Sequence, residues 1–172
     1  AGDAGSRGVE LWLQFCRAEL AFFQGELQET LTLARGVLQQ SDDIDDRALL
    51  CQFHLLAGES RFALDDRDSA LVHCQGALRL VDSRTEPELV DLSLFCLAKY
   101  FKYSGKLDRA LKQFKLCAHS RRRYELLDGR AEALVEIGAI ELFLERPQRA
   151  LRHLDRAGKA YSKTQNAIGL VK

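Results

Sequence analysis

Cysteine and histidine are the residues of this chain best suited to nucleophilic or metal chemistry, and two such pairs lie close together in the sequence. Cys51 and His54 lie three residues apart, and His73 and Cys74 are adjacent. A zinc site needs convergent ligands, usually from loops or short knuckles. These residues fall at ordinary positions of apolar helical patterns, and no Cys-x-x-Cys occurs. The sequence therefore predicts no metal site and no cofactor.

Catalytic motifs are not evident either. A Cys–His nucleophilic pair would require a third orienting group and an oxyanion donor, and no recognisable arrangement supplies them. The twelve glycines are scattered and form neither G-x-x-x-x-G-K nor G-x-G-x-x-G. The chain is predicted not to be an enzyme.

The cysteines also bear on location. A secreted disulfide framework has an even number of cysteines in a loop-rich chain, whereas this chain has five, each inside an apolar helical pattern. They are predicted to be reduced, mostly buried thiols of an intracellular protein, cytoplasmic or nuclear. They are Cys16, Cys51, Cys74, Cys96 and Cys117.

Charge limits the classes of partner. The 172 residues hold 25 basic and 25 acidic side chains, a balance that disfavours a generic nucleic-acid or membrane-surface binder. Residues 1–86 hold 8 basic and 15 acidic side chains, and residues 87–172 hold 17 and 10. Such a dipole can orient a partner. The densest basic run, Arg121-Arg122-Arg123, suits a solvated helix end. No apolar stretch is long enough for a transmembrane helix.

Small residues recur at a forty-residue period. Two helices approach closely only where a small side chain lets one backbone lie against the other, so each period predicts a helical hairpin. A breaker or polar turn, at Gly25, Asp65-Asp66, Gly105 and Glu145-Arg146-Pro147, separates the first two columns. The columns are Ala18, Gly58, Ala98 and Gly138; then Thr30, Ala70, Ala110 and Ala150; then Val37, Ala77, Cys117 and Ala157.

The hairpins define the expected helices and repeats. First helices are predicted at 9–23, 46–63, 87–103 and 127–144, and second helices at 27–40, 67–82, 107–122 and 148–163. The four repeats are 9–44, 45–84, 85–124 and 125–165. Residues 1–8 are expected to be a disordered lead-in. Residues 166–172 are expected to start a further, truncated helix of a longer native chain.

The Gly or Ala at 18, 58, 98 and 138, with Ala at 70, 110 and 150, resembles the signature of the tetratricopeptide repeat (TPR) family. The forty-residue period exceeds that family's usual length of about 34 residues and is similar to the long-helix variant of Pins-type adaptors and rapsyn. The resemblance implies an all-α fold, a right-handed superhelical solenoid of about four antiparallel helical hairpins. Arg17 and Thr30 depart from the pattern, so the first repeat is expected to act as a polar cap.

In that family the first helices line a concave groove where partner peptides lie. Some residues of this chain match groove positions of the family but are not among the expected contacts. They are Trp12, Phe23, Ala63, Leu92, Glu132, Ala139 and Phe143, and together with the contacts given next they are here called the groove column. The residues expected to contact a partner are Phe15, Glu19, Phe22, Gln52, Leu55, Glu59, Phe62, Phe95, Lys99, Lys102, Tyr103, Val135 and Leu142.

The resemblance also suggests a partner. Chaperone-binding members hold a C-terminal carboxylate with a Lys/Asn/Arg clamp, but the matching column here is Glu19, Glu59, Lys99 and Ala139. This column suits a peptide or helical segment of mixed charge, with its acidic portion near Lys99 and Lys102. The chain is therefore predicted to be a non-catalytic scaffold or adaptor that binds a protein, as part of a longer chain or a multiprotein complex. The alternatives are a nucleic-acid-associated helical-repeat protein and an enzyme regulatory domain.

Overall fold

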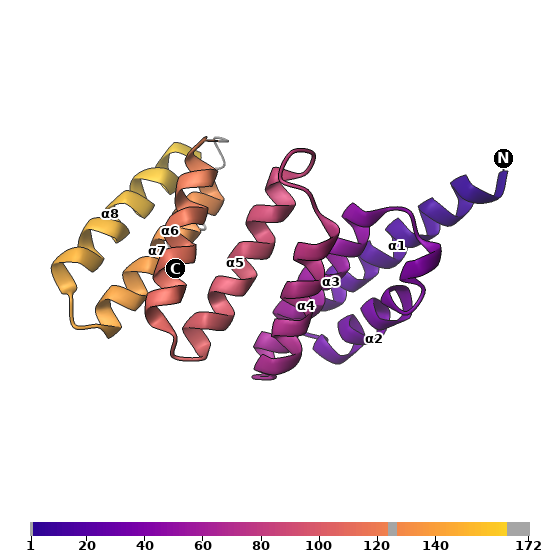
Figure 1. Cartoon of the computed structure of the whole chain (residues 1–172), viewed down its shortest axis with the longest axis horizontal. Coiled ribbons are helices and arrows are strands. Elements are labelled where there is room, and N and C mark those ends of the chain that lie inside the picture. The colour runs from indigo at the N-terminus through magenta and orange to yellow at the C-terminus, as the bar shows by residue number, and fades with distance from the viewer. Residues whose placement is uncertain (1, 124–126, 165–172) are drawn as a thin grey trace. The chain divides into compact units, whose positions relative to one another are not determined.

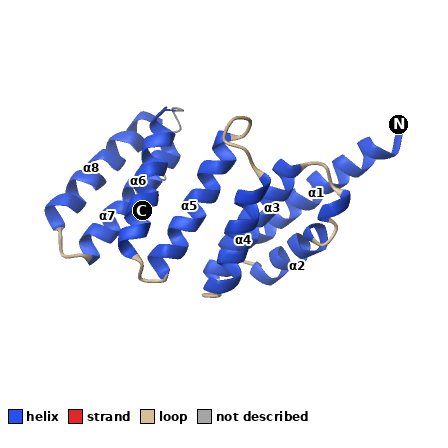
Figure 2. Cartoon of the chain, viewed as in Figure 1, coloured by secondary structure: helices blue, strands red, loops and turns tan. Residues whose placement is uncertain are grey.

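The computed structural model describes the backbone of residues 2–123 and 127–164 and the side chains of residues 6–120 and 129–163. These residues form eight α-helices joined by short loops, with one 3-10 turn, η1, at Ser41–Asp43 and no strand (Figures 1 and 2). The helices are α1 (Gly2–Gln24), α2 (Leu27–Leu38), α3 (Arg47–Ala63), α4 (Arg67–Leu80), α5 (Pro87–Tyr103), α6 (Leu107–Arg123), α7 (Leu127–Phe143) and α8 (Pro147–Thr164).

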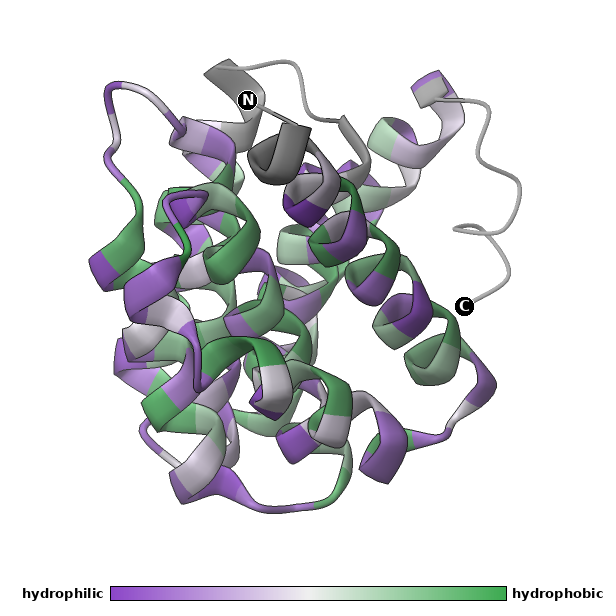
Figure 3. Ribbon diagram, turned by 90° about the vertical axis from the view of Figure 1, so that its right-hand side faces the viewer, coloured by the Kyte–Doolittle hydropathy of each residue, from purple (hydrophilic) through white to green (hydrophobic). Residues whose placement is uncertain are grey.

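The chain forms two compact units, residues 1–96 and residues 97–172. In the first unit, α1 packs on α2, α3 packs on α4, and α2 and α1 both contact α3. In the second unit, α7 packs against both α6 and α8. Hydrophobic and hydrophilic residues are interleaved along the helices (Figure 3), as expected where one side of each helix is buried. The fold is all-α and TPR-like, as predicted.

Helix bounds agree with the sequence prediction within two residues, except at the start of the chain. The prediction of a disordered lead-in at residues 1–8 is wrong, because α1 already begins at Gly2. Extending an existing helix adds a hydrogen bond for each residue fixed, without the cost of a new nucleus. The polar and small residues ahead of Val9 therefore continue the helix that the apolar residues start. The further helix expected at 166–172 lies outside the described residues.

All four hairpin turns share one backbone motif. Gly25, Asp65, Gly105 and Glu145 are forty residues apart, and each has a positive φ between 58° and 81°. In each turn the next amide donates to the carbonyl five residues back, for example Arg146 to Glu141 at 2.8 Å and Glu26 to Ala21 at 2.8 Å. This is the Schellman motif, which satisfies the last carbonyls of a helix. One residue in each predicted turn thus has a left-handed backbone conformation.

The small-residue columns lie where the paired helices meet. All four residues of each column are buried. A Cβ on Gly138 would lie 2.8 Å from a methyl carbon of Leu154 and 3.6 Å from the carbonyl oxygen of Ala150. In the first repeat, the Thr30 hydroxyl donates to the carbonyls of Ala18 at 3.4 Å and Glu26 at 3.2 Å. The substitution of Thr for Ala is therefore accommodated, because the buried hydroxyl is hydrogen-bonded.

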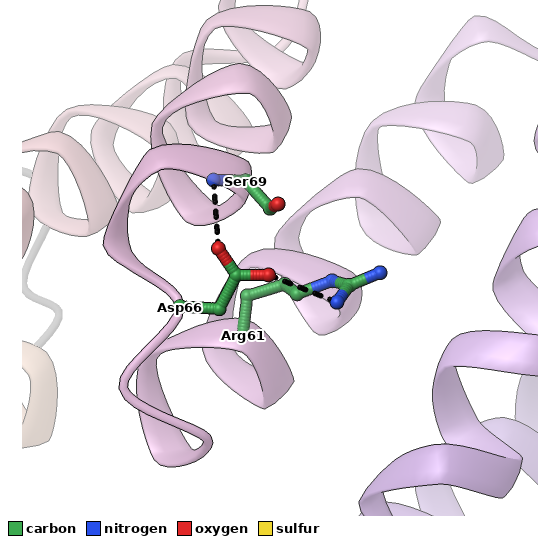
Figure 4. Close-up of polar contacts among 3 residues, drawn as sticks. All are labelled: Arg61, Asp66 and Ser69. Atoms are coloured by element: carbon green, nitrogen blue, oxygen red, sulfur yellow. Dashed lines mark hydrogen bonds and ion pairs between the residues drawn. The ribbon is translucent and has the colours of Figure 1, made fainter.

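Aspartates cap the helices of the second hairpin. Asp46 accepts a hydrogen bond from the amide of Leu49 at 2.9 Å, at the start of α3. Asp66 accepts one from the amide of Ser69 at 3.2 Å, at the start of α4, and pairs with Arg61 at 2.9 Å (Figure 4). The hydrogen bonds from Ser69 lower the pKa of Asp66, and Arg61 adds to the effect. Asp66 thus joins the end of α3 to the start of α4.

The cysteines differ from the prediction that every thiol is free. Cys74 of α4 and Cys96 of α5 form a disulfide, with their Cα atoms 5.9 Å apart, within the usual range. Cys51 and Cys117 are free and buried, and Cys16 is free and exposed. Spacing along the sequence could not reveal the pairing, because it depends on how α4 and α5 stack. With the disulfide present, the cysteines no longer argue for an intracellular protein. Over its described part, the chain has no helix with the length and hydrophobicity of a membrane span.

The turn motif predicts opposite effects for two substitutions. Glu145→Gly should stabilise the protein by about 0.5–1 kcal/mol, because glycine adopts a positive φ without a steric penalty. Gly105→Ala, at the equivalent turn, should destabilise it by about 1 kcal/mol or more. Urea unfolding of both variants measures the two changes. Equal signs would contradict the shared turn geometry.

The contact at Gly138 predicts the effect of a larger side chain. Gly138→Leu should destabilise the protein by about 1–3 kcal/mol, because Leu154 and the α8 backbone occupy the space that the new side chain needs. Gly158→Leu is the matched control, since a Cβ on Gly158 of α8 meets nothing within 4 Å. Thermal unfolding should show a lower Tm for the first variant only. An unchanged Tm for Gly138→Leu would show that the assigned helix contact is wrong.

Candidate partner-binding faces

Helix α1 exposes a continuous apolar face in the first unit. Its opposite face, with Phe15 and Ala18, belongs to the core with Leu31, Leu49 and Phe53. The exposed residues are Val9, Trp12, Leu13, Cys16, Leu20 and Phe23, here called the α1 stripe. Five of them are 45–81% exposed large hydrophobic side chains. The expectation that the first repeat is a polar cap is therefore wrong, although Arg17 itself is exposed.

Two predicted groove residues of the first unit are core residues instead. Phe15 is 7% exposed and packs edge-on against Phe53, with ring centroids 5.3 Å apart, and Phe95 is 6% exposed. Neither side chain is available to a partner, so these two predictions are wrong. One turn of α1 separates the buried Phe15 from the exposed Trp12, and the small-residue column alone did not resolve that difference. The other groove positions of this unit remain accessible. Those that are partly exposed are Glu19, Phe22, Gln52, Leu55, Glu59 and Phe62, and those that are more fully exposed are Trp12, Phe23, Ala63 and Leu92.

Helix α7 presents the clearest apolar face of the second unit. Leu134, Ile137 and Ile140 are each 1% exposed, on the sides of α7 that α6 and α8 cover. Apolar side chains also occupy the uncovered side, at Val135 (39% exposed), Ala139, Leu142 (52%) and Phe143 (77%), here called the α7 stripe. These positions were all in the predicted groove column. The structure thus brings the predicted residues of α7 together on one exposed face.

An ion pair lies beside the α7 stripe. The ammonium of Lys102, from the end of α5, lies 2.6 Å from the Glu136 carboxylate of α7. It also lies 5.4 Å from the centroid of the Tyr103 ring. Lys102 was predicted to contact an acidic part of a partner, but its charge is already compensated within the unit. Lys99 is partly exposed. The side chains of Arg121 and Arg122 lie outside the described residues.

The cysteines and histidines of the two sequence pairs make different contacts in the structure. The Nδ1 atoms of His54 and His73 lie 3.1 Å apart, so one imidazole donates to the other. Cys51 instead contacts the hydroxyl of Ser93 at 3.7 Å, and burial raises the pKa of its thiol, which disfavours a reactive thiolate. No group of three or more residues with metal-ligand chemistry forms in the described part of the chain.

The histidine pair lines a pocket of about 210 Å³ between α2, α3 and α4. Gly76 makes room for the His54 ring, since a Cβ there would lie 2.5 Å from it. Burial lowers the pKa of His54 to about 4, and His73 and Arg79 add to the shift. Burial and Arg61 also lower the pKa of His73, against the effect of Asp66. The pocket is lined by Leu31, Arg35, Leu38, Gln39, His54, Ala57, Arg61 and His73.

The neutral histidine pair predicts a pH dependence of stability. Unfolding returns the pKa of His54 to 6.5, so the unfolded chain binds a proton that the folded chain does not bind until about pH 4. Above pH 6.5 the imidazole is neutral in both states, so its titration does not reduce the free energy of unfolding. As the pH falls from 6.5 to 4, proton binding by the unfolded chain progressively lowers the free energy of unfolding.

Urea unfolding at pH 7 and pH 4.5 tests this dependence. His54→Asn should reduce the loss of unfolding free energy between the two pH values by about 1–2 kcal/mol, allowing for partial exposure of the ring. His119→Asn, at an exposed position of α6, is the control and should keep the wild-type loss. Equal losses in all three proteins would contradict the role of His54.

Comparison with known proteins identifies the fold. No protein-family model matches the sequence, and no curated protein matches it. One similar solved structure is aspartyl phosphate phosphatase F from Bacillus subtilis, with a TM-score of 0.82 and 17% identity over 94% of this chain and 42% of that chain. Another is BtubC (BKLC) from P. vanneervenii, with a TM-score of 0.76 and 14% identity over 90% of this chain and 64% of that chain. This chain thus spans less than two thirds of either protein. At these identities the likeness shows the fold alone, a TPR-like helical repeat, and membership of the long-helix variant stays a prediction.

Proposed function

We propose that this chain is a non-catalytic adaptor that binds a peptide or helical segment of a partner protein along the exposed faces of its first helices. The observation that carries the proposal is the α7 stripe. Leu142 and Phe143 are 52% and 77% exposed on a helix whose other sides are covered by α6 and α8. Large apolar side chains that lie together in water often mark a surface that binds a partner. The uncovered side of α7 is therefore suited to a partner.

The chemistry of the stripe indicates the kind of segment. Val135, Ala139 and Leu142 are spaced by four and three residues and so lie on one face of α7. A helical segment with its own apolar residues at such a spacing can pack against this face, with aromatic side chains as anchors. The small Ala139 at the centre leaves room for a larger side chain of the partner.

Polar groups border the same face and support a partner of mixed charge. Glu132 is exposed one turn before Val135. The ion pair between Lys102 and Glu136 borders the stripe and leaves both side chains about a quarter exposed, at 26% and 22%. Charged groups at the rim of an interface mainly select the partner and its orientation, whereas the apolar centre provides affinity.

A pair of matched variants tests the proposal. The full chain is used to capture partners from an extract of its native cells, and the bound segment is mapped with overlapping peptides. Leu142→Glu should weaken binding of the mapped peptide by about 2 kcal/mol or more, about thirtyfold in Kd, because it places a charge in the apolar centre. Fluorescence anisotropy measures Kd, and circular dichroism checks that the variant remains folded.

Leu151→Glu is the control, since Leu151 is a 60% exposed leucine of α8 and lies outside the first helices. It should leave Kd unchanged. Equal binding by the Leu142→Glu and wild-type chains would show that the α7 stripe is not the binding face. An equal loss in both variants would show that acidic substitution acts through net charge, which also contradicts the proposal.

A further inference from the structure

The pocket that the histidine pair lines is a feature that the proposed adaptor function does not use. Its volume of about 210 Å³ is below the roughly 300–1,000 Å³ of pockets for drug-sized ligands, so it suits a small group. Two guanidinium groups and two imidazoles line it, from Arg35, His54, Arg61 and His73. The lining comes from α2, α3 and α4 and the loop after α2, which follow α1 and precede α5 in the first unit. The walls of the pocket therefore do not involve the first or the last helix of the chain.

Arg61 brings an unsatisfied donor to this pocket. Its Nη1 atom pairs with the carboxylate of Asp66 at 2.9 Å (Figure 4). Its Nε atom is buried and has no hydrogen-bond partner among the described residues. An unpaired N–H of a buried charged group costs free energy, so such a group normally has an acceptor. An oxygen atom bound beside Arg61 would supply one.

The histidine pair can supply further donors. The two neutral rings are joined through their Nδ1 atoms, so the accepting ring carries its own proton on Nε2 and the donating ring has a bare Nε2. Uptake of one proton from the solvent protonates that bare Nε2 and gives the pair a positive charge. The pair thus changes from one free N–H donor to two when a nearby negative charge stabilises the added proton.

The charges around the histidine pair favour an anion over a metal cation. Burial lowers the pKa of both imidazoles, and the positive charges of Arg79 and Arg61 add to the shift. Arg35 contributes a further guanidinium to the lining. Asp66 acts in the opposite direction but is paired with Arg61. Several guanidinium groups would repel a metal ion, whereas they bind oxyanions through charge-assisted hydrogen bonds.

The second unit shows that the fold does not require this cluster. Two forty-residue periods after Arg61 stands Glu141, which pairs with Arg146 at 3.6 Å, with the charges exchanged. Two periods after His54 stands the apolar Leu134. An ion pair across the hairpin turn can therefore have either polarity, and a histidine is not needed between the helices. The combination of arginines and histidines belongs to the first unit and is suited to a ligand.

We propose that the pocket lined by Arg35, His54, Arg61 and His73 binds a small oxyanion of the phosphate class. The ligand is either free phosphate or the phosphoryl group of a small monoester. The guanidinium groups pair with its oxygens, because their planar donor arrangement matches phosphate. The histidine pair donates to it and takes up a proton as it binds. A ligand of so few atoms has limited affinity, so Kd is expected between about 10 µM and about 1 mM.

Titration calorimetry with inorganic phosphate tests the site. The full chain at pH 7, with ionic strength held constant by sodium chloride, should show saturable binding of one phosphate. Arg35→Gln should raise Kd at least about tenfold, because it removes a charge-assisted hydrogen bond. The matched control is Arg17→Gln, since Arg17 is an exposed arginine of α1 outside the pocket. It should change Kd by about twofold or less. Circular dichroism checks that both variants remain folded.

Ethyl phosphate distinguishes the two sources of the anion. Binding as tight as that of inorganic phosphate would show that the pocket accepts the phosphoryl group of a larger small molecule. Binding at least about tenfold weaker would show that the pocket encloses free phosphate, because a well-packed site rejects added groups. Either result supports the anion site and identifies its ligand.

Sulfate tests the part of the histidine pair, because it keeps two negative charges between pH 7.5 and pH 5, whereas phosphate gains a proton there. NMR titration of the imidazole signals should show the pKa of His54 rising from about 4 towards its ordinary 6.5 when sulfate is bound. Sulfate should therefore bind at least about twofold more tightly at pH 5 than at pH 7.5. His119, exposed on α6, is the control and should keep its pKa.

The other groups that face the histidine pair do not titrate in this range. Arg35, Arg61 and Arg79, from α2, α3 and α4, stay protonated. The hydrogen bonds from Ser69 lower the pKa of Asp66 below its ordinary value of 3.8, so its carboxylate stays ionised. A change in sulfate affinity between pH 7.5 and pH 5 thus reports on the imidazoles.

Three results would overturn the anion site. They are no saturable phosphate binding up to about 10 mM, equal weakening by Arg17→Gln and Arg35→Gln, and an unchanged pKa of His54 at saturating sulfate. The second would show that anions bind through net charge alone, and the third that they bind away from the histidine pair. Because none of these residues belongs to the α7 stripe, failure of the anion site can be distinguished from failure of the proposed adaptor function.

Discussion

Each hairpin of this protein depends on the close approach of two helix backbones at small side chains. At Gly138 the backbone of α8 and Leu154 fill the space where a side chain would lie. At Ala18 the contact is close enough for the Thr30 hydroxyl to reach the carbonyl of the facing helix. Because this contact fixes how the two helices pair, it also fixes which residues are buried. A larger residue there would separate the helices and open the core around it.

The same packing accounts for the apolar faces. Within the first unit α1 contacts α2 and α3, and within the second unit α7 contacts α6 and α8. Lys102 of α5 also pairs with Glu136 of α7, yet over the described residues one side of each helix remains exposed. On α1 and α7 that side carries large apolar residues, such as Phe23 and Leu142. The described part of each unit thus combines a buried core with an exposed apolar face.

Local features were predictable, and features that depend on contacts between helices were less so. The turns at Asp65 and Glu145 follow from the period, because a turn depends on a few adjacent residues. The hairpin itself contains a signal for His54 and His73, since pairing Gly58 with Ala70 places the two imidazoles nearly opposite each other. The Cys74–Cys96 disulfide depends on stacking between hairpins. Phe15 was predicted wrongly because a rotation of α1 by less than one turn moves a side chain from the groove into the core. Residue type does not determine that rotation.

The identical spacing of the turns limits how a chain of this kind can change in length. The left-handed residues at 25, 65, 105 and 145 and the small-residue columns share one period of forty. Duplication or loss of a forty-residue block keeps every column aligned with its neighbours. An insertion of a few residues inside a helix rotates all later side chains by about 100° per residue and moves the small residues out of the contact. Evolution of such an array therefore proceeds in whole hairpins, with smaller insertions confined to the loops between repeats.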